Sequence, residues 1–256
     1  MTRDMHRKRP NLNAPRSHPV HLRAAGPRLG CRRRLGYHRR MPPAVPAPSA
    51  PPTPGTIVVK LGGSLAGAPD LFTFTAQFAT RDDVVIVPGG GPFADAVRHA
   101  EGPLRLSRGA CHRMAILGME QMAHALRDIA PALRPLRTLD EVRRHRAGLW
   151  FPATELLGAD DIEESWDVTS DSLACWLARR IGAARVVLVK APGAVPPMNA
   201  AAATSADIAG WTRSGRVDGA FAAYAAAFGG PVHVIAADDA AGIARLFGPL
   251  PRRSAA

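Results

Sequence analysis

Two lysines stand out because this chain otherwise uses arginine almost everywhere: only three of its 33 basic residues are lysines. Lys60 closes an apolar, β-branched run that starts at Thr56, and Lys190 follows a similar run over 185–189. A lysine is a compact point charge that suits contact with phosphate oxygens. A solvated surface lysine has no reason to follow a buried strand. We therefore expect Lys60 and Lys190 to serve a functional site.

Glycines follow two of the apolar runs. Gly62, Gly63 and Ser64 come directly after Lys60 and Leu61, and residues 89–91 are three consecutive glycines after the run 84–87. Glycine lets backbone N–H groups approach phosphate oxygens closely. A single Gly-Gly pair is more often a tight turn, but here the arrangement recurs. Neither segment has the spacing of a Walker A loop or a Rossmann fingerprint, which argues against those two classes of nucleotide-binding protein.

A third segment, residues 165–174, carries Asp167 and Asp171 four positions apart. If Asp167 caps a helix and Asp171 lies in its first turn, both carboxylates lie near the positive end of the helix dipole. There they would orient the lysines or hold Mg²⁺. Ordinary helix capping is the alternative interpretation, above all for Asp167.

A basic cluster surrounds the expected start of a long helix over 107–129, with Ser107 as its N-cap. Its members are Arg105, Arg108, His112 and Arg113. Such a cluster would bind an anionic substrate. A solvated basic helix end is the alternative, and for His112 we weigh the two equally.

The elements that must position these residues alternate between strands and helices, which predicts an α/β fold with a mainly parallel sheet. Ligands of such sheets bind beyond the carboxyl ends of the strands, where the lysines and glycines lie. We expect one domain over 56–250. The expected strands are 56–60, 84–87, 149–151, 185–189 and 232–236, and the expected helices are 93–100, 107–129, 170–181 with Gly182 as its C-cap, 218–228 and 239–247.

The remaining expectations concern packing. Residues 191–216, rich in Ala, Pro and Gly, should form a loop over one face. Trp166, Trp176 and Cys175 should pack in the core, as should a methionine stripe formed by Met114, Met119 and Met122.

Charge is concentrated at the N-terminus. Residues 1–40 hold twelve basic residues and one acid, so the net charge of the remainder is close to neutral although the whole chain carries +12. We expect a disordered, basic and Pro-rich extension over 1–55. It is a tail for nucleic acid or another acidic partner, a targeting peptide, or an upstream extension of the gene with Met41 as the true start. We favour the last and do not expect a nucleic-acid partner.

No stretch is long and apolar enough for a membrane span, and three scattered cysteines form neither a disulfide framework nor a metal-binding spacing. These features predict a cytoplasmic protein without a membrane partner.

Together, the segments 58–64, 87–92 and 169–174 resemble the amino acid kinase family, which includes acetylglutamate, aspartate, glutamate, uridylate and isopentenyl phosphate kinases. The resemblance covers about 56–247 and implies a three-layer αβα sandwich. Two features depart from the family: its usual T-D-V-D-G gives way to residues 189–193, and its later Gly-Gly-Met segment with a lysine gives way to 215–219. Within the family, these departures and residues 112–121 look most like the branch containing the methanofuran-biosynthesis kinase of aminomethylfuranyl-methyl phosphate.

The resemblance implies an ATP-dependent phosphotransferase, with Mg²⁺ arriving on ATP and no metal bound by protein side chains. Lys60 and Lys190 would flank the transferred phosphate, with Lys190 in place of the missing second lysine, and Asp171 would hold both. Gly62, Gly63 and Ser64 would bind the nucleotide phosphates, whereas the acceptor would lie against Gly89, Gly90, Gly91, His112 and Asp167, the last pairing with an ammonium group.

Two other functions remain open: a kinase for a carboxylate acceptor, giving an acyl phosphate, and a non-catalytic nucleotide or oxyanion binder of the same fold. The acceptor is a small anionic metabolite in either kinase. From the resemblance alone we also expect a homo-oligomer.

Overall fold

A computed structural model describes residues 55–195 and 201–248, all within one compact unit of the chain. The expectations for the N-terminal extension, including a start at Met41, therefore lie outside the described residues, apart from Gly55. Among the described residues, no helix is long and apolar enough to cross a membrane.

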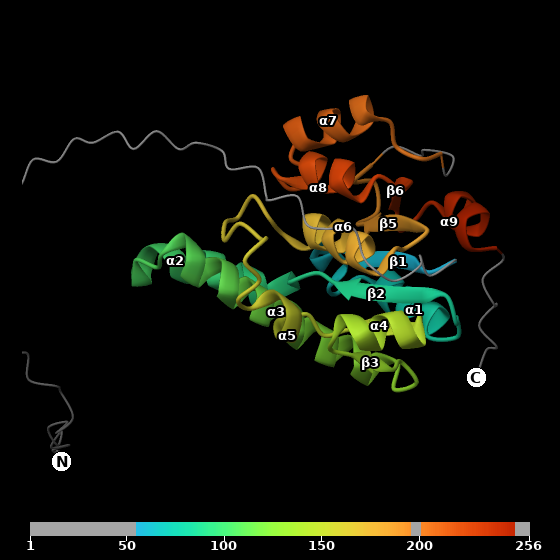
Figure 1. The fold of residues 1–256 in the computed structure, drawn as a ribbon, viewed down its shortest axis with the longest axis horizontal. Coiled ribbons are helices and arrows are strands. Elements are labelled where there is room, and N and C mark those ends of the chain that lie inside the picture. The colour runs from blue at the N-terminus through green and yellow to red at the C-terminus, as the bar shows by residue number, and fades with distance from the viewer. Residues whose placement is uncertain (1–54, 196–200, 249–256) are drawn as a thin grey trace, which may run out of the picture. The chain divides into compact units, whose positions relative to one another are not determined.

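The centre of the fold is a six-stranded sheet in the order β3-β4-β2-β1-β5-β6, in which every described pairing is parallel (Figure 1). Strands β1, β2 and β6 are buried along their whole length and β5 at all but its first residue, as expected for strands covered on both faces. The strands are β1 (Ile57–Leu61), β2 (Val84–Pro88), β3 (Pro135–Leu136), β4 (Gly148–Trp150), β5 (Arg185–Lys190) and β6 (Val232–Ala236).

Helices cover both faces of the sheet, so the predicted three-layer α/β architecture is confirmed (Figure 1). One face is covered by α6 (Ser170–Ile181), α7 (Ser205–Arg213) and α8 (Phe221–Phe228). The other packs against α1 (Pro69–Phe78), α9 (Ala240–Phe247) and the C-terminal half of α3 (Arg108–Ile129). The remaining helices are η1 (Gly63–Leu65), α2 (Gly91–Leu104), α4 (Leu139–His145) and α5 (Ala153–Leu156).

Several local signals act as expected. The Ser107 hydroxyl caps α3 by accepting a hydrogen bond from the Ala110 N–H. Gly182 ends α6 in the left-handed conformation, with φ of 66°, which favours glycine. Cys175 and Trp176 are buried in the core.

Other expectations are wrong. The expected loop over 191–216 contains helix α7, which starts at a Thr204–Asp207 capping box. Helix α2 is longer than predicted at both ends: it starts earlier because Pro92 lies in its first turn, where a missing N–H costs nothing, and it continues through Pro103 to Leu104. Met114 is 37% exposed, so only Met119 and Met122 of the methionine stripe are buried.

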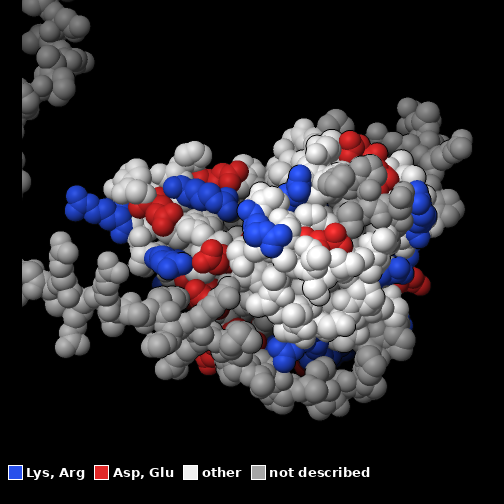
Figure 2. All heavy atoms as spheres, turned by 90° about the horizontal axis from the view of Figure 1, so that it is seen from above, with Lys and Arg blue, Asp and Glu red and all other residues white. Residues whose placement is uncertain are grey.

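Acidic and basic side chains are interspersed on the face shown in Figure 2, rather than gathered into a basic stripe. The described part of the chain thus shows no strongly basic surface on this face, which agrees with the near-neutral charge of the sequence after residue 40.

Candidate active site

The ammonium groups of Lys60 and Lys190 lie close together because both side chains point to the same face of the sheet. Side chains two residues apart point to the same face of a sheet. Lys60 follows Val58 and Lys190 follows Leu188 at this spacing, and both valine and leucine lie in the core beneath α6. Because β1 and β5 are neighbours, with Lys60 opposite Leu188, the two ammonium groups meet at the carboxyl edge of the sheet.

This edge is also where the chain changes direction. After β1 the chain forms α1 on one face, whereas after β5 it forms α7 and α8 on the other. Adjacent parallel strands that lead to opposite faces leave a crevice between their carboxyl ends, the usual ligand site of open α/β sheets. Lys60 and Lys190 lie at the carboxyl ends of these two strands.

Asp171 joins the lysines. Its Oδ1 lies 2.8 Å from Lys60 Nζ, and its Oδ2 accepts a hydrogen bond of 2.6 Å from Lys190 Nζ. All three side chains are buried, with Asp171 4% exposed. Burial raises the pKa of Asp171, but the two ammonium charges and their hydrogen bonds outweigh it, so the pKa is lowered overall. Burial and the nearby Lys60 charge lower the pKa of Lys190.

A second aspartate, which the sequence analysis did not single out, fixes the start of α6. The Asp218 Oδ2 accepts hydrogen bonds from the N–H groups of Thr169 (2.9 Å) and Ser172 (3.0 Å) and from the Thr169 hydroxyl (2.8 Å). The Ser172 hydroxyl donates to Oδ1. Asp218 thus caps α6 from a distant segment, because N-cap Thr169 makes no side-chain cap of its own.

Asp218 lies in the segment 215–219, which departs from the family pattern. Burial and the nearby Asp171 charge raise the pKa of Asp218, against the lowering effect of its hydrogen bonds. No local signal tied it to α6, because its partners are 46 and 49 residues away.

The two glycine loops pack backbone against backbone. A Cβ on Gly63 would overlap the backbone nitrogen of Gly91, and a Cβ on Gly89 would overlap that of Gly63. Gly91 itself has φ of 52°, in the left-handed region. Hydrogen bonds extend the sheet into the loops, from Gly62 N–H to Val189 O (3.1 Å) and from Gly89 N–H to Leu61 O (2.9 Å). The predicted glycines therefore lie side by side.

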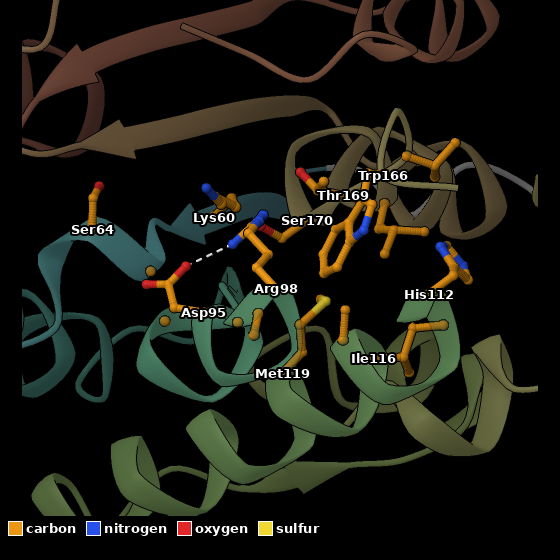
Figure 3. A pocket seen from close by; sticks show the side chains of 17 residues that line it. Lys60, Ser64, Asp95, Arg98, His112, Ile116, Met119, Trp166, Thr169 and Ser170 are labelled. Carbon is orange, nitrogen blue, oxygen red and sulfur yellow. Dashed lines mark hydrogen bonds and ion pairs between the residues drawn. The ribbon is translucent and has the colours of Figure 1, made fainter. Parts of the chain in front are cut away.

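A cavity of about 300 Å³ opens beside this centre (Figure 3). Of the predicted site residues, Lys60, Gly63, Ser64, Gly90, Gly91 and His112 line it. Asp171, Lys190, Gly62 and Gly89 are not among the lining residues, although Asp171 pairs with Lys60 of the wall. The cavity is also lined by Ala94, Asp95, Arg98, Ala115, Ile116, Met119, Trp166, Val168, Thr169, Ser170 and Leu173.

Asp167 does not line the cavity. Its side chain is 65% exposed and lies 3.6 Å from Arg108. The expectation that Asp167 caps α6 is wrong, since the N-cap is Thr169. Its expected role toward an ammonium group remains a prediction.

The predicted basic cluster is mostly engaged elsewhere. Arg113 binds Glu164 at 2.6 Å, Arg108 lies against Asp167, and neither lines the cavity. Trp166, expected in the core, lines the cavity instead, together with Arg98 of α2. A sequence does not distinguish the wall of a cavity from the interior of a core, because both favour large apolar side chains.

Residues 55–135 match the model of the amino acid kinase family. This confirms the resemblance to that family. A second comparison finds the [5-(aminomethyl)furan-3-yl]methyl phosphate kinase of Methanocaldococcus jannaschii, 30% identical over 138 residues, which are 51% of this chain and 63% of the relative. The match thus spans less than two thirds of that relative's length.

Solved structures support the same fold. Uridylate kinase from Archaeoglobus fulgidus aligns with a TM-score of 0.53 at 18% identity, covering 71% of this chain and 90% of that enzyme. UMP kinase from Bacillus anthracis aligns with a TM-score of 0.55 at 16% identity, covering 75% of this chain and 91% of that enzyme. At such identities the likeness establishes the amino acid kinase fold.

Proposed function

We propose that the chain is an ATP-dependent phosphotransferase whose acceptor is a small phosphate monoester of the aminomethylfuran type, as in the synthesis of methanofuran-like cofactors. The observation that carries this proposal is the buried Lys60–Asp171–Lys190 cluster at the carboxyl edge of the sheet, beside two glycine loops. The activity for which the Methanocaldococcus relative is named supports the acceptor class. From the resemblance we also expect a homo-oligomer, and from the scattered cysteines of the sequence a cytoplasmic protein.

The cluster suits phosphoryl transfer, which depends mainly on in-line positioning and on neutralising charge on the moving group. Two ammonium groups share one carboxylate, so the cluster keeps an excess positive charge for the phosphates. Asp171 holds both ammonium groups before the nucleotide arrives, which avoids the cost of reorganising them during the reaction. The N-terminus of α6 adds positive potential at the same place.

The nucleotide phosphates would bind along the glycine loops. The backbone N–H groups of Gly62, Gly63 and Ser64 would donate to phosphate oxygens, as the sequence predicts. Gly89, Gly90 and Gly91 would border the acceptor side, with Gly90 and Gly91 at the cavity wall.

Magnesium enters this proposal as part of the MgATP substrate. Among the described residues, no group of three or more His, Cys, Asp or Glu side chains is placed to hold a metal ion. Both oxygens of Asp171 face lysines, and Asp218 is occupied by hydrogen bonds from α6. The residues present thus fit a metal ligated by the phosphates and water rather than by these carboxylates.

The proposal is tested by ADP release from MgATP with aminomethylfuranyl-methyl phosphate as the acceptor, using the full chain. We expect turnover that requires the acceptor and is lost in Lys60→Ala, while the exposed Arg127→Ala keeps native turnover. Hydroxylamine trapping with glutamate or aspartate as acceptors separates the alternative, since only an acyl phosphate yields a hydroxamate. ATP binding without transfer to any of these acceptors would instead support a non-catalytic binder.

A further inference from the structure

The end of the cavity away from Ser64 has a composition of its own. In Figure 3 the labelled side chains run from Ser64 and Lys60 at one end to His112 at the other, with Arg98 and Trp166 between them. These three residues come from α2, the segment before α6, and α3. The side chains at this end indicate what kind of molecule binds there.

Trp166 supplies a fixed aromatic surface. Its indole Nε1 donates a hydrogen bond of 3.0 Å to Glu101 Oε2, which sets the orientation of the ring. The other three tryptophans of the chain are buried, with at most 6% exposure, whereas Trp166 is only half-buried and lines the cavity. Apolar side chains line the same cavity, among them Ile116, Met119, Val168 and Leu173.

Arg98 supplies a cation beside that surface. Its guanidinium lies 4.5 Å from the centre of the Trp166 ring and 2.7 Å from Asp95 Oδ1. The Arg98–Asp95 pair is half-exposed, at 50% and 60%, so it is held only weakly. Among the described residues that line this cavity, Lys60 and Arg98 are the lysine and the arginine, and so the permanently charged cations. An entering anion would therefore draw Arg98 from Asp95 at small cost.

His112 supplies a hydrogen-bond acceptor at the far end. Its Nδ1 lies 3.2 Å from the Ser165 carbonyl oxygen, so Nδ1 carries the proton and donates. Nε2 then presents a lone pair, and this buried atom has no hydrogen-bond partner among the described residues. An unpartnered buried polar atom in a cavity wall is costly unless a ligand or water completes it.

We propose that this end of the cavity selects an acceptor built on a small planar ring, with its phosphate between Arg98 and Lys60, its ring against Trp166, and a hydrogen-bond donor at His112 Nε2. The inference rests on the proposed kinase function and adds the residues that set acceptor specificity. It places the ammonium of an aminomethyl group at His112 rather than at Asp167, which lies outside the cavity wall.

Binding is measured without nucleotide, by intrinsic tryptophan fluorescence and by calorimetry on the full chain. Three probes are compared: [5-(aminomethyl)furan-3-yl]methyl phosphate, furan-3-ylmethyl phosphate without the amine, and the tetrahydrofuran analogue of the first, without the planar ring. We expect the planar probes to change the fluorescence, because Trp166 lines the cavity and is half-buried, whereas the other three tryptophans are buried. The saturated analogue should bind about tenfold more weakly, because it loses an aromatic contact worth about 1.4 kcal/mol.

Variants assign each part of the probe to a residue. Trp166→Leu should abolish the fluorescence change and remove the preference for the planar ring, whereas Trp166→Phe should keep most of that preference. Arg98→Ala should weaken all three probes by about tenfold or more, as expected for a lost charge-assisted contact, with Arg127→Ala as the matched control. His112→Ala should remove the preference for the aminated probe over furan-3-ylmethyl phosphate.

Equal binding of planar and saturated probes to the native chain would overturn the proposal, as would a ring preference that survives Trp166→Leu. Failure of all three probes to bind would overturn it as well. These results are separable from the fate of the kinase proposal. Lys60-dependent turnover without ring selectivity would leave the kinase function intact, whereas ring-selective binding without phosphoryl transfer would keep this site and reject the kinase.

Discussion

The two ends of the site are built in different ways. The Lys60–Asp171–Lys190 cluster lies on the central strands and the first turn of α6, with all three side chains buried and paired. The other end is formed by Arg98, Trp166 and His112, on helices and a connecting segment, and its Arg98–Asp95 pair is half-exposed. The strand-borne end is thus preorganised for charge, whereas the helix-borne end can adapt to the shape of an acceptor. A fold that separates the two can change its acceptor while keeping its chemistry.

The preorganised end should be the most sensitive to loss of charge. Asp171→Ala leaves two buried ammonium groups without a counter-ion, so we expect a loss of about 3–5 kcal/mol in the free energy of unfolding. Lys60→Met keeps the Asp171–Lys190 pair and should lose much less. Urea denaturation of both variants provides the measurement, and equal losses would mean that Asp171 does not hold the two lysines as a unit.

The contact between the glycine loops gives the next largest effect. Gly63→Ala would press a methyl group onto the Gly91 backbone, which cannot move as a flexible side chain would. We expect a loss of about 1–3 kcal/mol in unfolding free energy together with weaker ATP binding. Gly102→Ala is the matched control, because a Cβ there meets nothing within 4 Å, and it should be neutral or slightly stabilising. Similar thermal denaturation curves for the two variants would contradict the packing described here.

Asp218 tests whether α6 must be held for the cluster to work. Asp218→Asn weakens the cap on Thr169 and Ser172, and we expect about 1–2 kcal/mol of lost stability with a lower kcat. The KM for the acceptor should not change, because Asp218 does not line the cavity. A changed acceptor KM with native kcat would place Asp218 in acceptor binding instead. Both constants come from steady-state ADP release.

A smaller expected effect is the contribution of His112 to the pH dependence of stability. Burial lowers the pKa of His112 below its ordinary value of 6.5, against the raising effect of the Ser165 carbonyl. The unfolded chain then takes up a proton before the folded chain does, so stability should fall as pH drops below 6.5 and level off below the folded pKa. His112→Gln should lack this component. Urea denaturation between pH 8 and pH 5 measures the difference, and parallel profiles would show that His112 is not held neutral.

The exposed basic residues of α3 should matter least. Arg113 and Glu164 are paired at 2.6 Å, but both side chains are about half-exposed, so Arg113→Ala should cost less than about 1 kcal/mol. Acceptor binding should be unchanged, unlike in Arg98→Ala. A large rise in acceptor KM for Arg113→Ala would move the anion site from α2 to α3.

The two ends of the site also differ in how far they could be predicted from the sequence. Lys60, Lys190 and the glycines follow apolar strands, so their meeting follows from parallel topology. Asp218 and Trp166 could not be placed, because their partners lie in distant segments and their types fit ordinary roles. Helix α1 was not predicted, since its β-branched and aromatic residues over 71–78 have strand-like alternation. The capping box from Thr138 to Glu141 is a sequence signal for the start of α4.

The most direct test of the central claim is ³¹P NMR of the reaction of MgATP with aminomethylfuranyl-methyl phosphate, on the native chain, Lys60→Ala and Lys190→Ala. The account predicts that coupled diphosphate resonances of the product appear with ADP in the native reaction. Each lysine variant should slow their appearance by about 10²–10³-fold. Transfer at the native rate in either variant would contradict the assignment of the Lys60–Asp171–Lys190 cluster as the phosphoryl-transfer centre.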